Sequence, residues 1–165
     1  SILYNISLTN GSAAVIAPIG GAVLRGIAIA GSTAVNSAAT LLDFDGDFRT
    51  DFALFRRENS LWNIRNSGGG ADTVVQFGVS GTDILTPGDY DGDGRTDIAV
   101  WRTTSGFFFI RRSSDNTFQA FQFGQPGDEP VARDYDGDGR TDFAVVRREN
   151  GLMTWFIRNS SNGSL

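Results

Sequence analysis

The chain has 165 residues, of which 40% are hydrophobic and 20% are charged, a balance typical of a soluble globular domain with a moderate core. It contains no His and no Cys, which excludes disulfides, thiolate metal sites and catalysis that depends on an imidazole or a thiol. The formal net charge is −5, and all 14 basic residues are Arg without a basic run, so nucleic-acid binding is not expected.

The N-terminal segment, residues 1–36, is apolar and carries a single charged residue, Arg25. Apolar residues alternate at its start, which predicts a strand, at Ile2, Tyr4, Ile6 and Leu8. Residues 23–30 could form a second strand. The apolar run 13–30 contains Pro18, a Gly pair and Arg25, so we do not expect it to span a membrane.

Three nine-residue acidic loops follow, beginning 46 and then 45 residues apart, and they predict repeats at about 37–83, 84–129 and 130–165. Each loop has Asp at positions 1, 3, 5 and 9. These residues are Asp43, Asp45, Asp47 and Asp51, then Asp89, Asp91, Asp93 and Asp97, and finally Asp134, Asp136, Asp138 and Asp142. Carboxylates at this density repel one another strongly unless a cation lies among them, so the loops predict bound metal.

The donor set favours calcium. Oxygen ligands without His or Cys select a hard cation, and Ca²⁺ accepts many oxygens in flexible geometry. We expect the four Asp side chains and the position-7 backbone carbonyl to bind each ion, and that carbonyl belongs to Arg49, Arg95 and Arg140. The loop resembles an EF-hand calcium loop that closes at position 9. Solvated Asp-Gly turns are the alternative, but three copies in one register favour up to three calcium ions.

The first loop is expected to be the weakest site. Position 4 is Gly in every loop, and position 6 is Gly94 or Gly139 in two loops but Phe48 in the first. If position 6 is left-handed, a residue other than Gly costs about 1–2 kcal/mol there. We therefore predict a distorted or weaker first site.

Four short strands are expected in each repeat. An apolar strand follows each loop, at 52–55, 98–101 and 143–146, and a strand with an aromatic-Ile-Arg signature comes next, at 61–65, 107–111 and 152–158. A third strand ends in Phe-Gly, at 74–78 and 118–124, and a fourth enters the next loop, at 84–90 and 130–135. The pattern predicts an all-β protein of about three tandem four-stranded β-meander repeats, like propeller blades.

The strand at 107–110 is apolar on both faces, which indicates that neighbouring sheets cover both sides. We therefore expect the large aromatics to lie in the core rather than to form a sugar-binding platform, namely Trp62, Trp101, Trp155 and Phe109. One Arg lies 13 residues after the first residue of each loop, and we expect these side chains to pair with loop carboxylates: Arg56, Arg102 and Arg147.

The loops, together with Phe77-Gly78 and Phe123-Gly124, resemble FG-GAP or VCBS repeats, the calcium-binding blades of integrin α-chain β-propellers and their bacterial relatives. The resemblance covers roughly residues 37–160. It implies extracellular, calcium-stabilised propellers used for adhesion, carbohydrate contact or assembly, and it does not imply catalysis. The calcium ligands that it implies are the four Asp of each loop and the position-7 carbonyl.

The chain departs from the family pattern in two respects. An integrin-like propeller has seven blades, whereas this chain has three loops. The third repeat stops at residues 159–165, where the other repeats continue into a Phe-Gly strand, so we expect the last blade to lack its outer strand. This open edge and the apolar segment 1–36, a candidate strand donor, could pair within one molecule or between molecules.

These observations favour a secreted or cell-surface calcium-binding structural protein that assembles with copies of itself, into filaments where the contact does not close. The alternative is an adhesion module that binds carbohydrate or another cell-surface ligand. An extracellular setting is expected because such loops often bind calcium too weakly to fill at cytosolic levels. We do not expect an enzyme, since no nucleophile–base pair or phosphate-binding Gly loop occurs.

Overall fold

The computed structural model describes residues 2–6, 13–18 and 42–165. The chain divides into two compact units, residues 1–36 and residues 37–165. In the first unit, β1 (Ile2–Ile6) pairs antiparallel with β2 (Ala13–Pro18), with a register shift between Leu3 and Tyr4. The expected strand at residues 2–6 is thus observed, whereas Leu8 and the expected strand at 23–30 lie outside the described residues.

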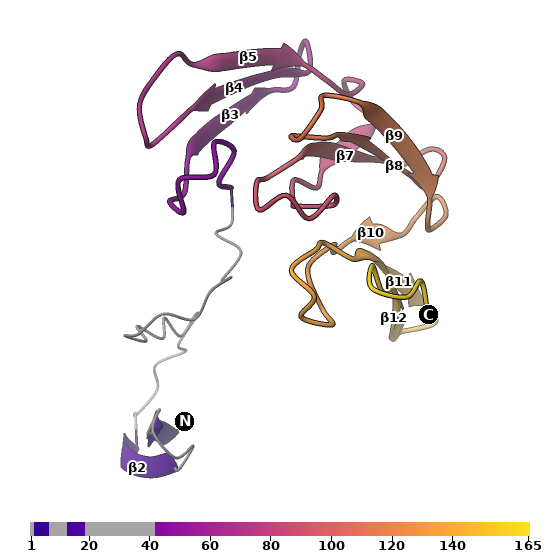
Figure 1. Cartoon of the computed structure of the whole chain (residues 1–165). Coiled ribbons are helices and arrows are strands. Elements are labelled where there is room, and N and C mark those ends of the chain that lie inside the picture. Colours follow the sequence, from indigo (N-terminus) through magenta and orange to yellow (C-terminus); the bar gives the residue numbers. More distant parts are fainter. Residues whose placement is uncertain (1, 7–12, 19–41) are drawn as a thin grey trace. The chain divides into compact units, whose positions relative to one another are not determined.

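Residues 42–165 form three antiparallel sheets that follow one another along the chain (Figure 1). The first sheet contains β3 (Phe52–Arg56), β4 (Leu61–Arg65) and β5 (Thr73–Gln76). The second contains β6 (Asp83–Leu85), β7 (Ile98–Arg102), β8 (Phe107–Arg111) and β9 (Phe118–Gln122). The third contains β10 (Glu129–Pro130), β11 (Phe143–Glu149) and β12 (Leu152–Arg158). The described residues include no helix, and hence none that could cross a membrane, and they confirm the predicted all-β fold of β-meander repeats.

The fourth strand of each repeat is shorter than expected. The predicted strands at 84–90 and 130–135 appear as β6 and β10, and beyond them the pairing continues only through the isolated bridges of Gly88 with Asp97 and Arg133 with Asp142. Each of these short strands pairs with the strand that follows the next loop.

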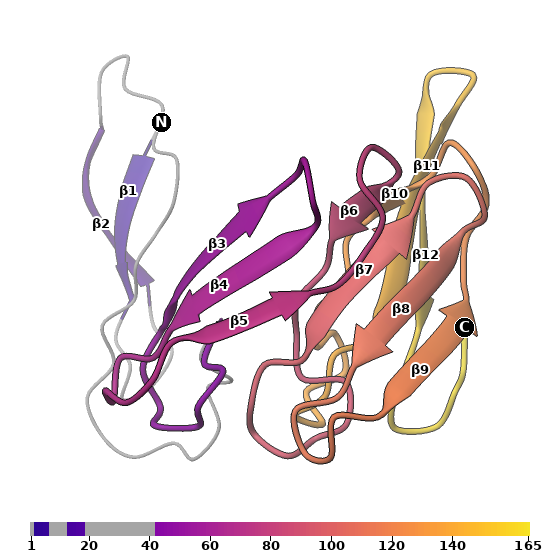
Figure 2. The same cartoon turned by 90° about the horizontal axis from the view of Figure 1, so that it is seen from above.

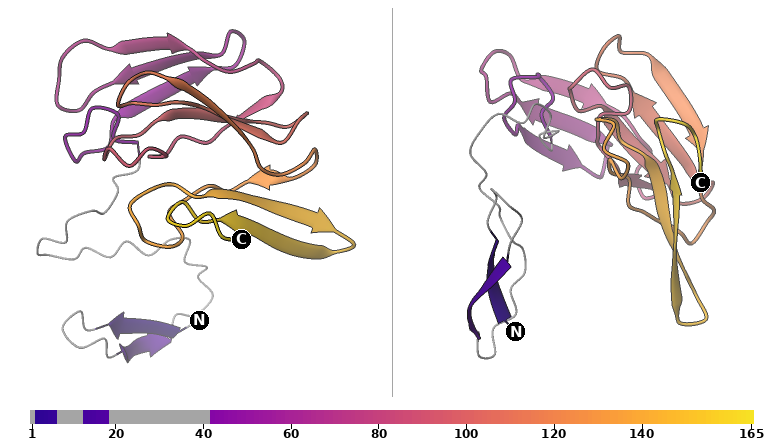
Figure 3. Two further views of the ribbon diagram at one scale, coloured as in Figure 1. Left: turned by 45° about the vertical axis from the view of Figure 1, so that its right-hand side comes forward. Right: turned by 60° about the horizontal axis from the view of Figure 1, so that its bottom comes forward.

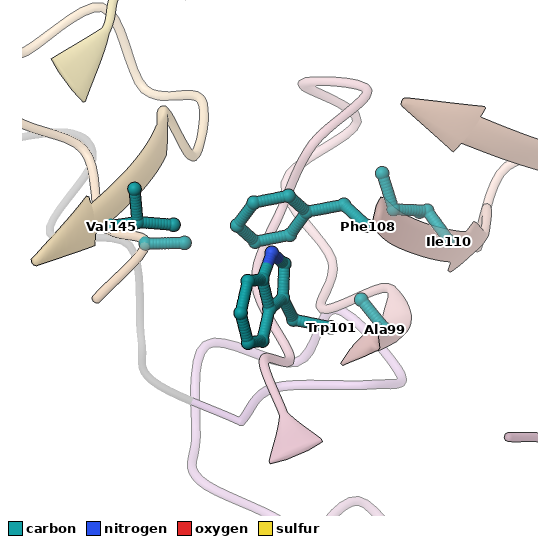
Figure 4. Packing of buried hydrophobic residues seen from close by; sticks show 6 residues of the cluster. Ala99, Trp101, Phe108, Ile110 and Val145 are labelled. Atoms are coloured by element: carbon teal, nitrogen blue, oxygen red, sulfur yellow. The ribbon is translucent and has the colours of Figure 1, made fainter. Parts of the chain in front are cut away.

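The second sheet is packed on both faces, as the apolar strand at 107–110 predicts. Because side chains alternate across a strand, Trp101 and Phe108 on one face join Val145 of the third sheet in a buried cluster (Figure 4). On the opposite face, Val100 packs with Trp62 of the first sheet. The three sheets therefore stack face to face (Figure 3). Burying a side chain such as Phe108 contributes about 1.5–3 kcal/mol.

The Phe-Gly signature ends the third strand of a repeat and anchors a buried tryptophan. The indole Nε1 of Trp62 donates to the carbonyl of Phe77, and that of Trp101 donates to the carbonyl of Phe123, each at 3.0 Å. The following Gly124 has φ of 104°, and an added Cβ would lie 3.1 Å from Val145 Cγ1. The signature thus combines a hydrogen-bond acceptor with a turn that only Gly adopts without strain.

Of the four aromatics expected in the core, three pack there and one does not. Trp62 and Trp101 are buried, and Phe109 is half-buried against the cluster between the first two sheets. Trp155 is 51% exposed. It lies on β12, and among the described residues no further sheet covers its face of the third sheet.

The prediction that the strand arginines pair with loop carboxylates is wrong for Arg102 and Arg147. Arg102 contacts Asp83 at 2.8 and 3.0 Å, and Arg147 contacts Asp128 at 2.7 and 3.0 Å, so the partners are carboxylates near the Phe-Gly turns rather than in the acidic loops. Each partner carboxylate also accepts a turn N–H, as Asp83 does from Val79 at 2.8 Å. These bidentate pairs fasten each turn to the sheet of the next repeat.

Candidate metal centres

Each acidic loop is positioned by the strand that follows it. The N–H of the position-9 Asp donates to the residue that precedes the loop: Asp51 to Leu42, Asp97 to Gly88 and Asp142 to Arg133, each at 2.8 Å. This bond closes the base of the loop directly before β3, β7 or β11. The three loops lie side by side at one end of the stacked sheets (Figure 2).

The position-1 carboxylate organises the turn of its loop. In the second loop, Asp89 accepts from the N–H of Gly92 at 2.6 Å and from that of Gly94 at 2.9 Å, one on each oxygen. In the third loop, Asp134 accepts in the same way from Gly137 and Gly139 at 2.7 and 3.0 Å. The loop backbone therefore wraps around this side chain and fixes its direction.

Position 6 is left-handed, as expected. Gly94 and Gly139 have φ of 86° and 89°, and Phe48 in the first loop has φ of 64°. The Phe48 N–H still donates to Asp43 at 2.8 Å, so the first loop keeps the shape of the others. Because the Phe48 side chain is 78% exposed, it gains little packing to offset the strain of about 1–2 kcal/mol.

The position-9 carboxylates are buried and doubly hydrogen-bonded. Asp97 accepts from the N–H of Tyr90 at 2.8 Å and from the N–H of Ser113 at 2.7 Å. The equivalent donors to Asp51 and Asp142 lie at 2.6 to 2.8 Å, and they are Phe44, Ser67, Tyr135 and Ser160. Each buried carboxylate thus connects the start of its loop to the turn after the second strand of the same sheet.

Sequence reasoning missed the serines that complete the loops. The hydroxyl of Ser113 donates to both oxygens of Asp93 at 2.9 Å, and Ser67 and Ser160 donate to the position-5 carboxylates of their own loops. A second serine, Ser114, donates to Asp91 at 2.6 Å. The signal was present, since the pattern Ile-Arg-x-Ser recurs at 64–67, 110–113 and 157–160.

The structure brings three of the four Asp of each loop together. The carboxylates at positions 1, 3 and 9 offer oxygens within 4.8 Å of one another, in the groups Asp43–Asp45–Asp51, Asp89–Asp91–Asp97 and Asp134–Asp136–Asp142. The position-5 Asp is outside these groups. At position 7, the N–H donates to the position-5 carboxylate, as Arg95 does to Asp93 at 2.8 Å. Each group could hold a cation, and its all-oxygen donor set fits calcium.

The electrostatics of the second loop show the strain that a cation would relieve. Burial raises the pKa of Asp97 to about 6, although N–H bonds from Ser113 and Tyr90 act in the opposite direction. Burial also raises the pKa of Asp89, and Asp91 and Asp93 add repulsion. For Asp91 burial is outweighed by hydrogen bonds from Ser114 and Arg112, and its pKa is lowered. A bound cation would favour the charged form of all three.

Adjacent loops are joined to each other by their backbones. The N–H of Thr96 in the second loop donates to the carbonyl of Asp43 in the first, and Thr141 donates in the same way to Asp89, each at 2.6 Å. The three loops line a hollow of about 600 Å³, and its lining includes three arginines: Arg95, Arg133 and Arg140. The three candidate sites therefore form one connected array.

Comparison with known families gives one finding for part of this array. Residues 43–100 match the model of a family described as FG-GAP-like repeat. The matched stretch begins at position 1 of the first loop, includes the first sheet and the second loop, and ends within β7. No match was found among curated proteins or among solved structures.

Proposed function

We propose, from the match of residues 43–100 to the model of the FG-GAP-like repeat family, that the chain is a calcium-binding structural repeat module. The observation that carries the proposal is the threefold recurrence of one donor arrangement. Each loop gathers the carboxylates of positions 1, 3 and 9 within 4.8 Å, and neighbouring loops share a hydrogen bond. Independent acidic turns would not be expected to repeat this geometry.

The residues of each loop would have different roles in binding the ion. The position-1 carboxylate is aimed by two backbone N–H groups, and the position-9 carboxylate is buried at the base of the loop. The serine hydroxyls hold the position-5 carboxylate, while position 3 completes the group. A calcium ion would supply the positive charge that these carboxylates lack, and loop closure would then be favoured.

Removing calcium tests the proposal. A site at 100 times its Kd contributes about 2.7 kcal/mol, which is a large share of the stability of a small domain. We expect the midpoint of thermal unfolding to fall by many degrees when millimolar Ca²⁺ is replaced by excess EGTA. Excess Mg²⁺ serves as the control for ionic strength and for the choice of ion. An unchanged midpoint in EGTA would rule out structural calcium.

We further propose that the module is extracellular, non-enzymatic and assembles with copies of itself. Among residues 42–165 no strand pairs with the outer edge of β12, and such an edge is a template for strand addition. The two-stranded sheet of β1 and β2 is a candidate donor.

Deleting residues 1–10 tests this strand route. The truncated protein should bind calcium normally, because the loops lie elsewhere, but should lose higher assembly in light scattering. A full-length protein that stays monomeric at high concentration, with a truncation that only lowers stability, would instead show that the strands complete their own molecule.

A second function, the binding of carbohydrate or another cell-surface ligand, is favoured by the hollow between the loops. Its lining combines arginines with Asp and Gly of all three loops. Isothermal titration with soluble glycans, with and without calcium, tests this function. Three aromatics stand at equivalent positions in the three sheets, Trp62, Phe108 and Trp155, and only Trp155 is exposed, so an aromatic platform is not supported.

A further inference from the structure

Within residues 42–165, one sheet face at each end of the stack is not covered by a further sheet. The first, called here the Trp155 face, belongs to the third sheet, and its exposed apolar side chains are Tyr135, Met153 and Trp155. Ala144 and Val146 on this face are buried, and Ile157 and Arg148 complete it. The second, called here the Leu54 face, belongs to the first sheet and consists of the exposed apolar side chains of Phe52, Leu54 and Val74 together with Asn63. Arg56 and Arg65 lie at the edges of the same face. Contiguous exposed apolar surface of this kind indicates an interaction site.

The Trp155 face repeats a surface that is buried elsewhere in the same chain. Strand register places Trp155 opposite Val146, Phe108 opposite Trp101 and Trp62 opposite Phe55. Trp62 and Phe108 are 2% and 0% exposed because the next sheet covers them, whereas Trp155 is 51% exposed. The tyrosine repeats as well, since Tyr90 stacks on Phe143 of the next sheet, whereas Tyr135 packs edge-on against Trp155 of its own sheet.

The Leu54 face repeats the opposite surface. Leu54 corresponds to Val100 and Val145, which follow their loops at the same distance and are fully buried against the preceding sheet. Leu54 itself is 59% exposed, and neighbouring Phe52 is 78% exposed. In both sheet-to-sheet interfaces of the chain, the preceding sheet packs on the surface that contains Val100 or Val145. The first sheet presents the equivalent surface at Leu54.

The Leu54 face is also hollowed. A cavity of about 330 Å³ lies over it, lined by Phe52, Leu54, Asn63 and Asp72 among others. Asn63 stands where the second and third sheets have Phe109 and Phe156, so a smaller side chain leaves this space. Its amide Nδ2 is buried and finds no hydrogen-bond partner within the described part of the chain. A large side chain from a partner would fill the cavity.

We propose that the Trp155 face of one molecule packs on the Leu54 face of a second copy. The contact continues the two sheet-on-sheet interfaces already present, which join these same two kinds of surface. The inference rests on the self-assembly proposed above and deepens it by naming the interface, which uses sheet faces rather than strand edges. Because the two surfaces differ, the contact is head-to-tail and can propagate to a third copy.

Two single variants test the contact, since each removes one surface and leaves the other intact. Trp155→Arg places a charge on the first face, and Leu54→Arg places one on the second. Both side chains are exposed, so each variant should fold and bind calcium as the wild type does. We expect sedimentation in calcium to show association of the wild type and a loss of about 30-fold or more in each variant. Val79→Arg, in the exposed turn after β5, is the control and should associate normally.

Mixing the two variants gives the decisive measurement. Trp155→Arg retains a normal Leu54 face, and Leu54→Arg retains a normal Trp155 face, so the mixture should form a one-to-one dimer that does not grow. A mixture that stays monomeric, or variants that still associate as the wild type does, would overturn the inference. A wild type that is monomeric at high concentration would overturn it too. Loss of assembly on deleting residues 1–10 alone, with both Arg variants unaffected, would uphold the strand route and reject this interface.

Discussion

At the scale of single residues, the residue type at position 6 distinguishes the first loop from the other two, although the backbone conformation there is left-handed in all three. Phe48 occupies the left-handed conformation that Gly94 and Gly139 adopt freely, and its N–H makes the same bond to the position-1 carboxylate. The loop shape is thus fixed by hydrogen bonds to Asp43 and its equivalents. The residue type at position 6 changes only the strain energy of the loop.

Substitutions at position 6 should therefore act in opposite directions. Gly94→Ala is expected to lower the free energy of unfolding by about 1–2 kcal/mol, and Phe48→Gly is expected to raise it. Phe48→Ala is the control, because it removes the same exposed ring but keeps a Cβ at positive φ. Urea unfolding in calcium gives the three values. If Phe48→Gly and Phe48→Ala are equally stable, φ strain is absent at this position.

The buried carboxylate of Asp97 should make the second site sensitive to pH. Its pKa of about 6 in the ion-free fold lies above its ordinary value, so ion-free protein gains stability as the pH falls from 7 toward 4. Protons compete with the ion over the same range, so calcium binding should weaken between pH 7 and pH 5. Urea unfolding in EGTA and calorimetric titration measure the two effects. Asp97→Asn should reduce this dependence at the second site and leave only the part that belongs to Asp89, whose pKa is also raised by burial. An unchanged dependence would assign it to another group.

At the scale of elements, each sheet is secured by a turn that reaches the next repeat. The carbonyl of the Phe-Gly turn accepts a hydrogen bond from a buried indole. A nearby carboxylate forms a bidentate pair with an arginine in a strand of the next sheet. Arg102 and Arg147 also lie over the rings of Phe109 and Phe156, at 4.2 and 4.6 Å from the ring centres. The arginines therefore pack as well as pair.

The indole hydrogen bond gives a direct comparison between two tryptophans. Trp101→Phe removes the donor to the carbonyl of Phe123 and should lower the free energy of unfolding by about 1–3 kcal/mol, since a buried acceptor loses its partner. Trp155→Phe is the matched control, because its ring is half exposed, and should change stability by less than about 0.5 kcal/mol at low protein concentration. Equal effects would mean that ring size, rather than the hydrogen bond, decides stability at Trp101.

At the scale of the whole molecule, local patterns predicted the elements well and their partners less well. The strands after each loop and the left-handed position 6 follow from short-range rules that repetition reinforces, so they could be predicted. The partner of Arg102 could not, because Asp83 lies in another repeat and only the fold brings them together. Trp155 lies in the same aromatic-Ile-Arg strand pattern as Trp62. Its exposure follows because no further sheet covers it within residues 42–165.

The same long-range dependence explains the missed serines. Ser113 lies 20 residues from Asp93, with two strands between them, and neither residue type alone indicates the contact. Only the threefold recurrence of Ile-Arg-x-Ser marks it. The position-5 carboxylates, expected among the ion ligands, are instead the residues that these hydroxyls hold, and whether they also bind an ion remains a prediction.

The stacking of the sheets has a consequence for how the molecule opens. Within residues 42–165 only the second sheet has another sheet on both faces, while the first and third each have one face without a covering sheet. In a linear array where each unit contacts only its neighbours, local opening starts at the outer units and rarely at the centre. We therefore expect protection of backbone amides from exchange to be greatest in β7 and β8 and to decline toward β3 and β12, so that the central sheet opens last.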